Sequence, residues 1–187
     1  QDTEIYCLTR MSYSLWFLGY PDQALVRMQE ALSLSQGLAL PHGLAYALTF
    51  AAGFHLFCQE GQVAQQCAEE ARRFATEHEF PIWATMGQIL DGSALVHQGI
   101  VEKGVHQIQE GMAAWRAIGA QISVPYFLSL LAEAYERSGQ TEKGLHVLTE
   151  ALALTNNTEE RWWEAELYRL YGELSLRLDE RESGRLG

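Results

Sequence analysis

Apolar residues recur at steps of three or four positions along most of the chain, a pattern that predicts amphipathic helices. The first segment shows it at Ile5, Leu8, Met11, Leu15 and Leu18. Glycine and proline interrupt the pattern at regular intervals, and they favour the end of one helix and the start of the next. The predicted helices cover about 1–19, 21–36, 42–59, 62–78, 82–98, 101–118, 122–138, 141–155 and 159–178.

The helical segments repeat with a period of about 40 residues, as the step from Gly99 to Gly139 illustrates. A fixed period of this length is typical of a solenoid of stacked helix pairs. Small residues recur in register at three positions, which are Ser12/Ala52/Gly92/Ala132/Gly172, Ala24/Ala64/Gly104/Gly144 and Ala31/Ala71/Gly111/Ala151. Helices that cross at short distance need small side chains at the crossing point, so we interpret these columns as crossing points. Gln59 replaces the turn glycine in one copy and Gly61 follows late, which predicts a slightly different turn there.

These columns resemble the tetratricopeptide repeat (TPR), most clearly where Leu131, Ala132 and Tyr135 match its apolar, small and aromatic positions. The period is longer than the ~34 residues usual in that family, and the expected proline recurs only near Pro41 and Pro81. The resemblance implies an all-α, right-handed α-α superhelix of four and a half helix hairpins. Its units would be about 1–40, 41–80, 81–120 and 121–158, followed by a capping helix at 159–178 and a frayed or disordered tail at 179–187.

A narrower resemblance concerns the segments that start at Pro125 and Glu160. They are similar to the carboxy-terminal repeat region of large bacterial signalling proteins with an ATPase module and often a cyclase or LuxR-type DNA-binding domain. The chain also begins at Gln1 instead of Met, so we expect a piece of a longer protein. The resemblance implies a protein-binding or regulatory scaffold module for protein–protein interaction. The alternative is a sensor arm that binds a small molecule in the aromatic part of the groove and regulates an attached domain.

The net charge of −11 argues against direct nucleic-acid binding, which requires clustered Lys and Arg. The sequence shows no signal peptide and no apolar run long enough for a membrane span. Its three cysteines form no CxxC pair, as expected for reduced thiols. These features predict a cytoplasmic protein without membrane contact.

Motifs for catalysis are absent from the sequence. It contains no phosphate-binding glycine loop with Lys, no HExxH and no GxSxG. His106 and His146 share one repeat column on the outer helices, where a surface role is expected, and Glu166, Arg169 and Glu173 have the spacing of ion pairs. We therefore expect no enzymatic activity, no cofactor and no metal.

The TPR resemblance implies a concave groove lined by the first helix of each hairpin. The groove residues predicted in this way are aromatic in the amino-terminal half and charged in the carboxy-terminal half. They are Tyr6, Thr9, Tyr13, Trp16, Phe17, Tyr46, Phe50, Phe57, Met86, His97, Tyr126, Glu133, Arg137 and Arg169. Dense exposed aromatics favour a recognition surface for a protein or peptide partner, or for other domains of the parent chain. The alternative is that the helices bury these aromatics between neighbouring units.

The last predicted helix carries a broad apolar stripe. Its members are Trp163, Leu167, Leu170, Tyr171, Leu174 and Leu178. A capping helix needs only one apolar face, against the unit before it. The extra width is interpreted as a surface for the next repeat or for a second molecule, which would give a homodimer through the C-terminal helix.

Overall fold

The computed structural model of the protein describes the backbone of residues 2–38 and 40–185, and their side chains up to residue 180. Within these ranges the secondary structure is helical. The helices are α1 (Asp2–Phe17), α2 (Pro21–Gly37), α3 (Pro41–Phe57), α4 (Gly61–Glu77), α5 (Pro81–His97), α6 (Val101–Ala117), α7 (Val124–Arg137), α8 (Thr141–Thr158) and α9 (Glu164–Arg185). None of these helices is both long enough and apolar enough to cross a membrane.

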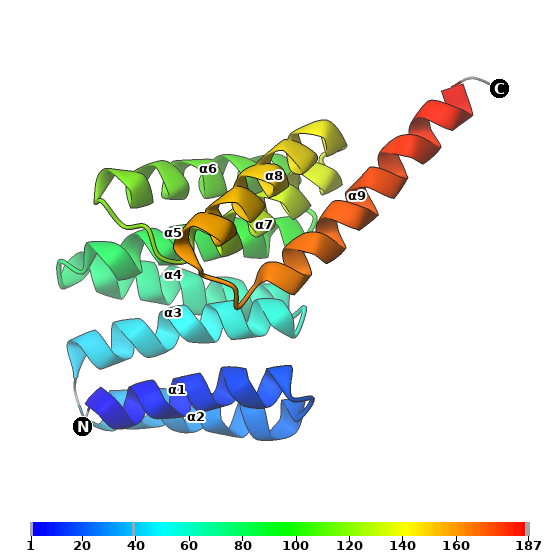
Figure 1. Ribbon diagram of the computed structural model, residues 1–187. Helices are drawn as coiled ribbons and strands as arrows, with labels where there is room; N and C mark the ends of the chain where they lie inside the picture. Colours follow the sequence, from blue (N-terminus) through cyan, green and yellow to red (C-terminus); the bar gives the residue numbers. More distant parts are fainter. Residues whose placement is uncertain (1, 39, 186–187) are drawn as a thin grey trace.

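Consecutive helices pair as antiparallel hairpins that stack in sequence order (Figure 1). The first helices α1, α3, α5, α7 and α9 contact one another in turn, whereas each second helix lies against its own first helix and the first helix of the next hairpin. The arrangement therefore has an inner layer of odd-numbered helices and an outer layer of even-numbered ones. This confirms the predicted all-α solenoid, with α9 as the unpaired half at the end of the described chain.

Close helix crossings at small residues hold each hairpin together. A Cβ atom added to Gly92 of α5 would lie 2.9 Å from the carbonyl oxygen of Gly104 in α6 and 2.9 Å from the Ile108 nitrogen. The corresponding Ser12, Ala52 and Ala132 are fully buried. The structure thus confirms that this column marks the crossing points of the first four hairpins.

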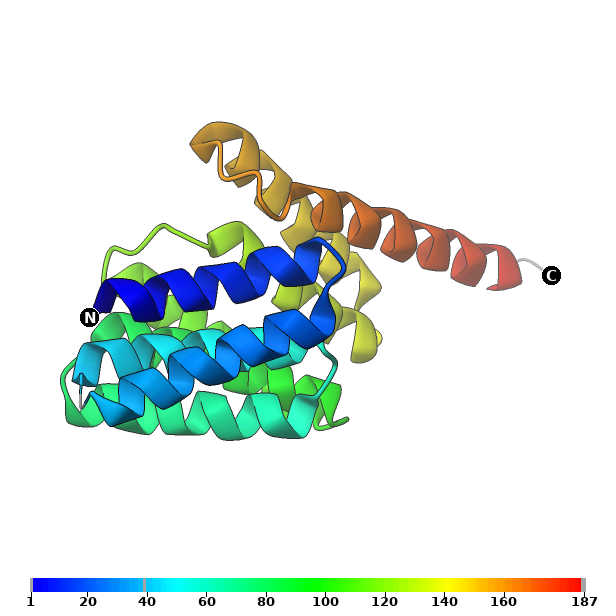
Figure 2. The ribbon, with the colours of Figure 1, turned by 90° about the horizontal axis from the view of Figure 1, so that it is seen from below.

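Gly172 is the exception in this column. It is exposed, and a Cβ built there would meet no atom within 4 Å. The physical reason is that no second helix packs on α9 within the described residues, so the crossing position has no partner. The C-terminal half of α9 projects away from the other helices in both ribbon views (Figures 1 and 2).

The helix-ending turns share one geometry. At Gly19 the backbone has a φ of 84°, and the N–H groups of Gly19 and Tyr20 donate to the carbonyls of Trp16 and Leu15, as in a Schellman motif. Gln59 adopts the same left-handed conformation, with a φ of 58° and the equivalent pair of hydrogen bonds. The expectation of a different turn around Gly61 was therefore wrong, because a non-glycine residue occupies the left-handed position.

The start and end of α9 also differ from the prediction. Glu159 adopts a left-handed conformation with a φ of 58° and ends α8, so α9 begins at Glu164 and not near residue 159. Where the sequence predicted a frayed tail from residue 179, the helix continues to Arg185. The Glu and Arg residues of this extension are good helix formers. Residues 186–187 of that predicted tail lie outside the described part.

The crossing geometry predicts opposite effects at two glycines of one column. Gly92→Ala should lower the free energy of unfolding by about 1–3 kcal/mol, because its methyl group would meet backbone atoms of α6. Gly172→Ala should raise it by up to about 1 kcal/mol, because alanine is the better helix former and the site is open. Urea unfolding followed by circular dichroism measures both changes. Changes of the same sign would contradict this assignment of the crossing points.

The turn geometry predicts that glycine stabilises a left-handed position and destabilises a helical one. Glu79 is exposed with a φ of 59°, so Glu79→Gly should raise the free energy of unfolding by about 1 kcal/mol by removing strain. The matched control is Glu70→Gly, on the exposed face of α4. This substitution should lower the free energy of unfolding by about 1 kcal/mol. Thermal and urea unfolding of the two variants measures both changes. A loss of stability in Glu79→Gly would refute the left-handed conformation assigned to residue 79.

Candidate functional site

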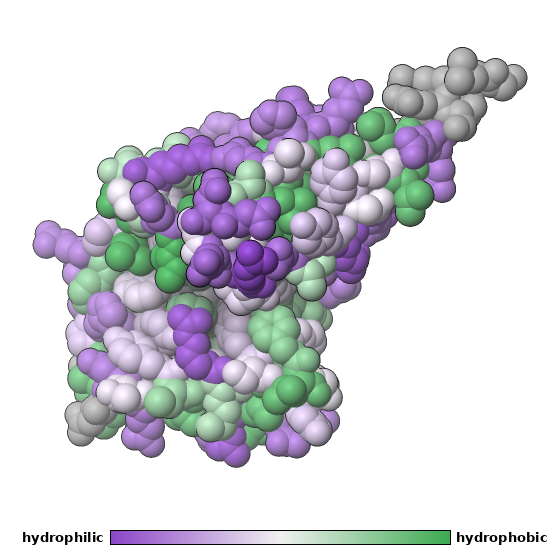
Figure 3. Space-filling model, in the orientation of Figure 1, coloured by the Kyte–Doolittle hydropathy of each residue, from purple (hydrophilic) through white to green (hydrophobic). Residues whose placement is uncertain are grey.

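A groove of about 920 Å³ lies on the inner layer, between the ends of α1, α3 and α5 on one side and α7 and α9 on the other. The residues of α1, α3 and α5 that line it belong to the C-terminal ends of those helices, as Trp16, Leu56 and His97 show. Figure 3 shows this face, where apolar residues gather near the end of α1 and hydrophilic residues over the later helices. The lining residues are Trp16, Phe17, Leu56, Phe57, Gln59, His97, Tyr126, Leu130, Glu133, Glu136, Arg137, Trp162, Trp163, Ala165, Glu166, Arg169, Leu170, Glu173 and Arg177.

Aromatic rings form one end of the groove, which we call the aromatic end, consisting of Phe17, Phe57, Tyr126 and Trp163. Trp163 stacks on Phe57, with ring centroids 5.2 Å apart and an interplanar angle of 19°. It also contacts the rings of Phe17 at 6.3 Å and Tyr126 at 5.1 Å. These contacts bring the segment before α9 against α1 and α3, so the two ends of the solenoid meet across the groove.

The loop of residues 159–163 positions Trp163 through hydrogen bonds to α7. Both carboxylate oxygens of Glu160 accept from the backbone N–H of Ser123, at 2.9 and 3.0 Å. The indole N–H of Trp162 donates to Glu160 at 2.9 Å, and that of Trp163 donates to the Ser129 hydroxyl at 2.8 Å. Both indole donors are therefore satisfied, and these hydrogen bonds hold the two rings in place beside α7.

Ion pairs form the other end of the groove. Arg169 donates to both carboxylate oxygens of Glu166, at 2.6 and 2.7 Å, and to Glu173 at 2.8 Å. Arg177 donates to Glu173 at 2.7 Å and pairs with Glu136 of α7. The predicted pairing of Arg169 with Glu166 and Glu173 is thus present. The partner of Glu136 is thus supplied by α9.

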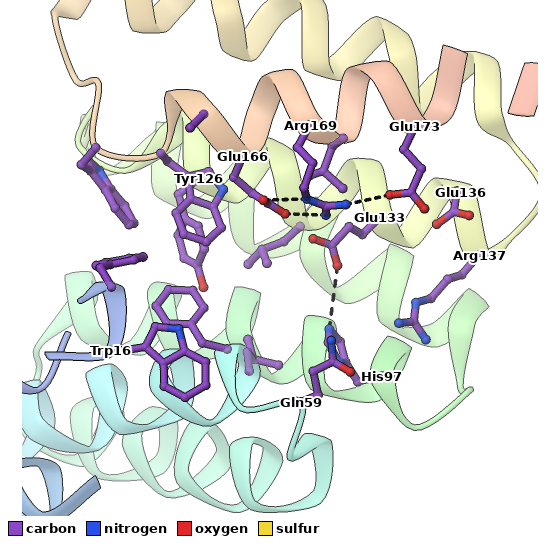
Figure 4. Close-up of a pocket in the computed structure, with 18 of the residues that line it drawn as sticks. Trp16, Gln59, His97, Tyr126, Glu133, Glu136, Arg137, Glu166, Arg169 and Glu173 are labelled. Carbon is purple, nitrogen blue, oxygen red and sulfur yellow. Dashed lines mark hydrogen bonds and ion pairs between the residues drawn. The ribbon is translucent and has the colours of Figure 1, made fainter. Parts of the chain in front are cut away.

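Glu133 of α7 faces the groove without a hydrogen bond among the described residues. Its carboxylate lies 3.9 Å from the Nε2 of His97, and 25% of its side chain is exposed (Figure 4). Burial, followed by the negative charge of Glu166, raises the pKa of Glu133 to about 7. Burial and then the charge of Arg137 lower the pKa of His97. Near neutral pH the pair therefore holds a carboxyl group that exchanges its proton readily beside a neutral imidazole.

The Tyr126 hydroxyl is a second polar group without a partner in the groove. Tyr126 is only 4% exposed, and its oxygen makes no hydrogen bond within the part of the chain that the structure describes. Burial and the nearby Glu133 raise the pKa of the phenol, so the hydroxyl stays protonated. A buried hydroxyl without a partner costs free energy. The Tyr126 side chain lines the groove, but its oxygen is shielded from solvent beside Gly53 of α3.

The structure brings together only part of the predicted groove set. Eight of the predicted residues line the groove, namely Trp16, Phe17, Phe57, His97, Tyr126, Glu133, Arg137 and Arg169. The others lie outside it, namely Tyr6, Thr9, Tyr13, Tyr46, Phe50 and Met86.

The six residues outside the groove take part in packing between hairpins. Tyr46, Phe50 and Met86 are buried, and the Thr9 hydroxyl donates to the Ile5 carbonyl of its own helix. Tyr13 of α1 donates to the Phe50 carbonyl of α3 at 2.8 Å. The interpretation in which helices bury the aromatics between units thus holds for Tyr46 and Phe50, but not for Phe17, which is exposed at the groove.

Several lining residues were absent from the predicted set, above all Trp162 and Trp163. Their assignment to a helix beginning near residue 159 placed Trp163 on a packing stripe, whereas both precede α9 and lie against the groove. The run Asn156-Asn157-Thr158 before the tryptophans was the available signal, because Asn and Thr are poor helix formers that favour the ends of helices. Across the described ranges, no group of three or more His, Cys, Asp or Glu side chains is arranged to hold a metal ion.

The chain matches no protein-family model. An uncharacterized protein of Rhizobium meliloti (strain 1021) is 23% identical over 181 residues, which cover 97% of this chain and 18% of that protein. The chain thus corresponds to less than a fifth of this much longer relative.

Several solved structures share the fold at low sequence identity. Aspartyl phosphate phosphatase F from Bacillus subtilis superposes with a TM-score of 0.68 at 14% identity, over 96% of this chain and 47% of that one. TPR-like repeats of a putative kinesin light chain from Podosopora anserina superpose with a TM-score of 0.63 at 14% identity, over 99% of this chain and 92% of that one. The third is a signal transduction ATPase with numerous domains from Pyrococcus horikoshii, which has a tetratricopeptide repeat sensor. It superposes with a TM-score of 0.62 at 13% identity, over 92% of this chain and 26% of that one. The chain therefore has the fold of a TPR-like helical repeat domain.

Proposed function

We propose that this domain is a non-enzymatic binding module that holds an extended segment of a protein partner in its groove. The observation that supports this most is the composition of the groove, where an exposed aromatic surface adjoins polar groups without partners. Phe17 and Trp162 are 55% and 47% exposed at its rim, and the Tyr126 hydroxyl and Glu133 carboxylate lack hydrogen bonds. Aromatic residues at this density are enriched at protein interfaces.

The proposed context is a larger signalling protein in which the domain serves as a regulatory scaffold. The chain spans 18% of its bacterial relative and 26% of the ATPase that carries a tetratricopeptide repeat sensor. These proportions support a role as one part of a longer chain, with the groove open either to other domains or to a separate protein.

The second candidate is a sensor that binds a small molecule at the aromatic end. The buried hydroxyl of Tyr126 beside the rings of Phe57 and Trp163 favours it, because small-molecule sites combine apolar walls with a few fixed polar groups. A metabolite that raises the melting temperature of the wild type, but not of Tyr126→Phe, would support the sensor. A screen in which only peptides raise it would support the scaffold.

The exposed face of α9 is a further part of the proposal, as a contact for the next repeat or a second copy. Tyr171 and Leu176 are 39% and 66% exposed, and Gly172 offers an open crossing position. Sedimentation velocity over a concentration series tests the homodimer. A single monomer species at high concentration would leave the next repeat as the partner of this face.

Binding in the groove predicts a selective loss of affinity in one of two matched variants. Peptides selected from a random display library on the immobilised chain provide the probes, with fluorescence anisotropy as the measurement. Phe17→Ala should weaken binding more than fivefold, because an interface aromatic contributes more than about 1 kcal/mol. Tyr168→Ala should leave affinity unchanged, since Tyr168 is equally exposed, at 56% against 55%, but lies outside the groove. Equal losses in both variants, or no selected peptide, would contradict the proposal.

A further inference from the structure

The charges of the groove leave one carboxylate without a cation. Four glutamates and three arginines line it, which leaves one negative charge in excess when all are ionised. Arg169 and Arg177 are held by Glu166 and Glu173 through ion pairs within α9, and Arg177 also pairs with Glu136 of α7. The remaining carboxylate is that of Glu133.

No arginine or lysine of the described chain forms an ion pair with Glu133; the charges of Arg137 and Arg169 lower its pKa, but burial and Glu166 raise it more. The nearest basic group is the imidazole of His97, which is 3.9 Å away and whose pKa is lowered. Arg137 is exposed, so its guanidinium is hydrated by solvent and gains little from leaving it. Glu133, in contrast, is largely removed from water, and its ionised form is costly unless a positive charge approaches. Glu133, and not Arg137, is therefore the group that gains from an oppositely charged partner.

Helix ends of both signs border the groove. Trp16, Phe57 and His97 belong to the last turns of α1, α3 and α5, and the C-terminal end of a helix carries a partial negative charge from its aligned peptide dipoles. Tyr126 and Glu166 belong to the first turns of α7 and α9, where the same dipoles give a partial positive charge. The preference for a cation therefore rests on the Glu133 carboxylate and not on the helix dipoles.

Tyr126 shows how far the aromatic end lies from Glu133 along α7. The Tyr126 hydroxyl, buried and without a partner, lies on the same helix as Glu133 (Figure 4). Seven residues separate the two positions, which is two turns of α7, or about 10 Å. Leu130 lies between them in the groove wall. An occupant that spans both positions places one end at the aromatic rings and the other at the carboxylate.

We propose that the groove recognises a basic residue of the bound segment, whose ammonium or guanidinium pairs with Glu133 while a neighbouring apolar side chain packs on Phe17, Phe57 and Trp163. This inference rests on the proposed function and specifies its ligand. Binding then supplies the positive charge that the Glu133 carboxylate lacks in the free domain.

Two other occupants would respond differently to pH. An anion would be repelled when Glu133 ionises, and a carbonyl oxygen would accept a hydrogen bond only from the protonated carboxyl. Both would bind more weakly as the pH rises through 7. A cation requires the ionised form and binds more tightly over the same range. The sign of the pH dependence therefore distinguishes the occupants.

Selected peptides provide the test, with the library panned at pH 8 and affinities measured by fluorescence anisotropy at pH 6 and pH 8. We expect enrichment of Lys or Arg beside an apolar residue. Affinity should rise about tenfold from pH 6 to pH 8, because the ionised fraction of a group with a pKa of about 7 grows by that factor. Replacing the basic residue of the peptide by norleucine should weaken binding at least tenfold at pH 8.

Protein variants assign the effect to Glu133. Glu133→Gln should weaken binding of the basic peptide and abolish its pH dependence, whereas Glu102→Gln, an exposed site on α6 outside the groove, should change neither. His97→Gln should keep the pH dependence, which excludes the imidazole as its source. Arg137, Arg169 and Arg177 remain charged over this range, and the paired Glu136, Glu166 and Glu173 are common to all variants.

The outcomes separate the inference from the function on which it rests. Peptides without basic residues, or affinity that falls from pH 6 to pH 8, would overturn the inference. If Phe17→Ala still weakened such peptides, the proposed function would stand. A library that yields no peptide would count against both, and identical binding by Glu133→Gln would overturn the inference alone.

Discussion

The structure depends on the close approach of two helices at each hairpin. In the third hairpin the backbones of α5 and α6 approach so closely at Gly92 and Gly104 that a methyl group on either would meet the other helix. The first two and the fourth hairpins achieve a similar approach with buried Ser12, Ala52 and Ala132. Because glycine costs about 1 kcal/mol relative to alanine inside a helix, packing must offset that loss. Short crossings allow the first helices to lie side by side and form one inner face.

This inner face becomes a groove only because the chain turns back over it before α9. The loop of residues 159–163 attaches to the start of α7 through Glu160, and Trp163 then reaches Phe57 of α3. An aromatic pair contributes about 0.5–1.5 kcal/mol beyond its buried area. The ion pairs of α9 contribute less, because more than half of the Arg169 side chain is exposed and solvent screens its charge. The aromatic contacts therefore hold the loop before α9 against α3 and complete the groove, while the ion pairs determine the charge of the groove.

The sequence was sufficient to predict the fold because its signal is local and repeated. Small residues return every 40 positions or so, and glycine or proline marks most helix ends. The turn at Gln59 was misjudged because a repeat tolerates one strained residue when the helices on both sides fix the geometry. Gly172 was misjudged because a repeat column shows which residue could face a helix, but not whether that helix is present.

The candidate site was harder to predict because the spacing of residues along a helix shows which way a side chain points but not how deeply it is buried. Tyr46 and Phe50 face the inner layer as expected, yet α1 and α5 lie against α3 along its length and bury both rings. Phe57 has the same direction but lies at the end of α3, where the groove begins. The distinction depends on how far neighbouring hairpins diverge, a property of the whole stack. Trp163 depends on a contact with a residue 106 positions earlier, which no local pattern encodes. The groove therefore lies at the C-terminal ends of the first three inner helices, where packing between hairpins stops.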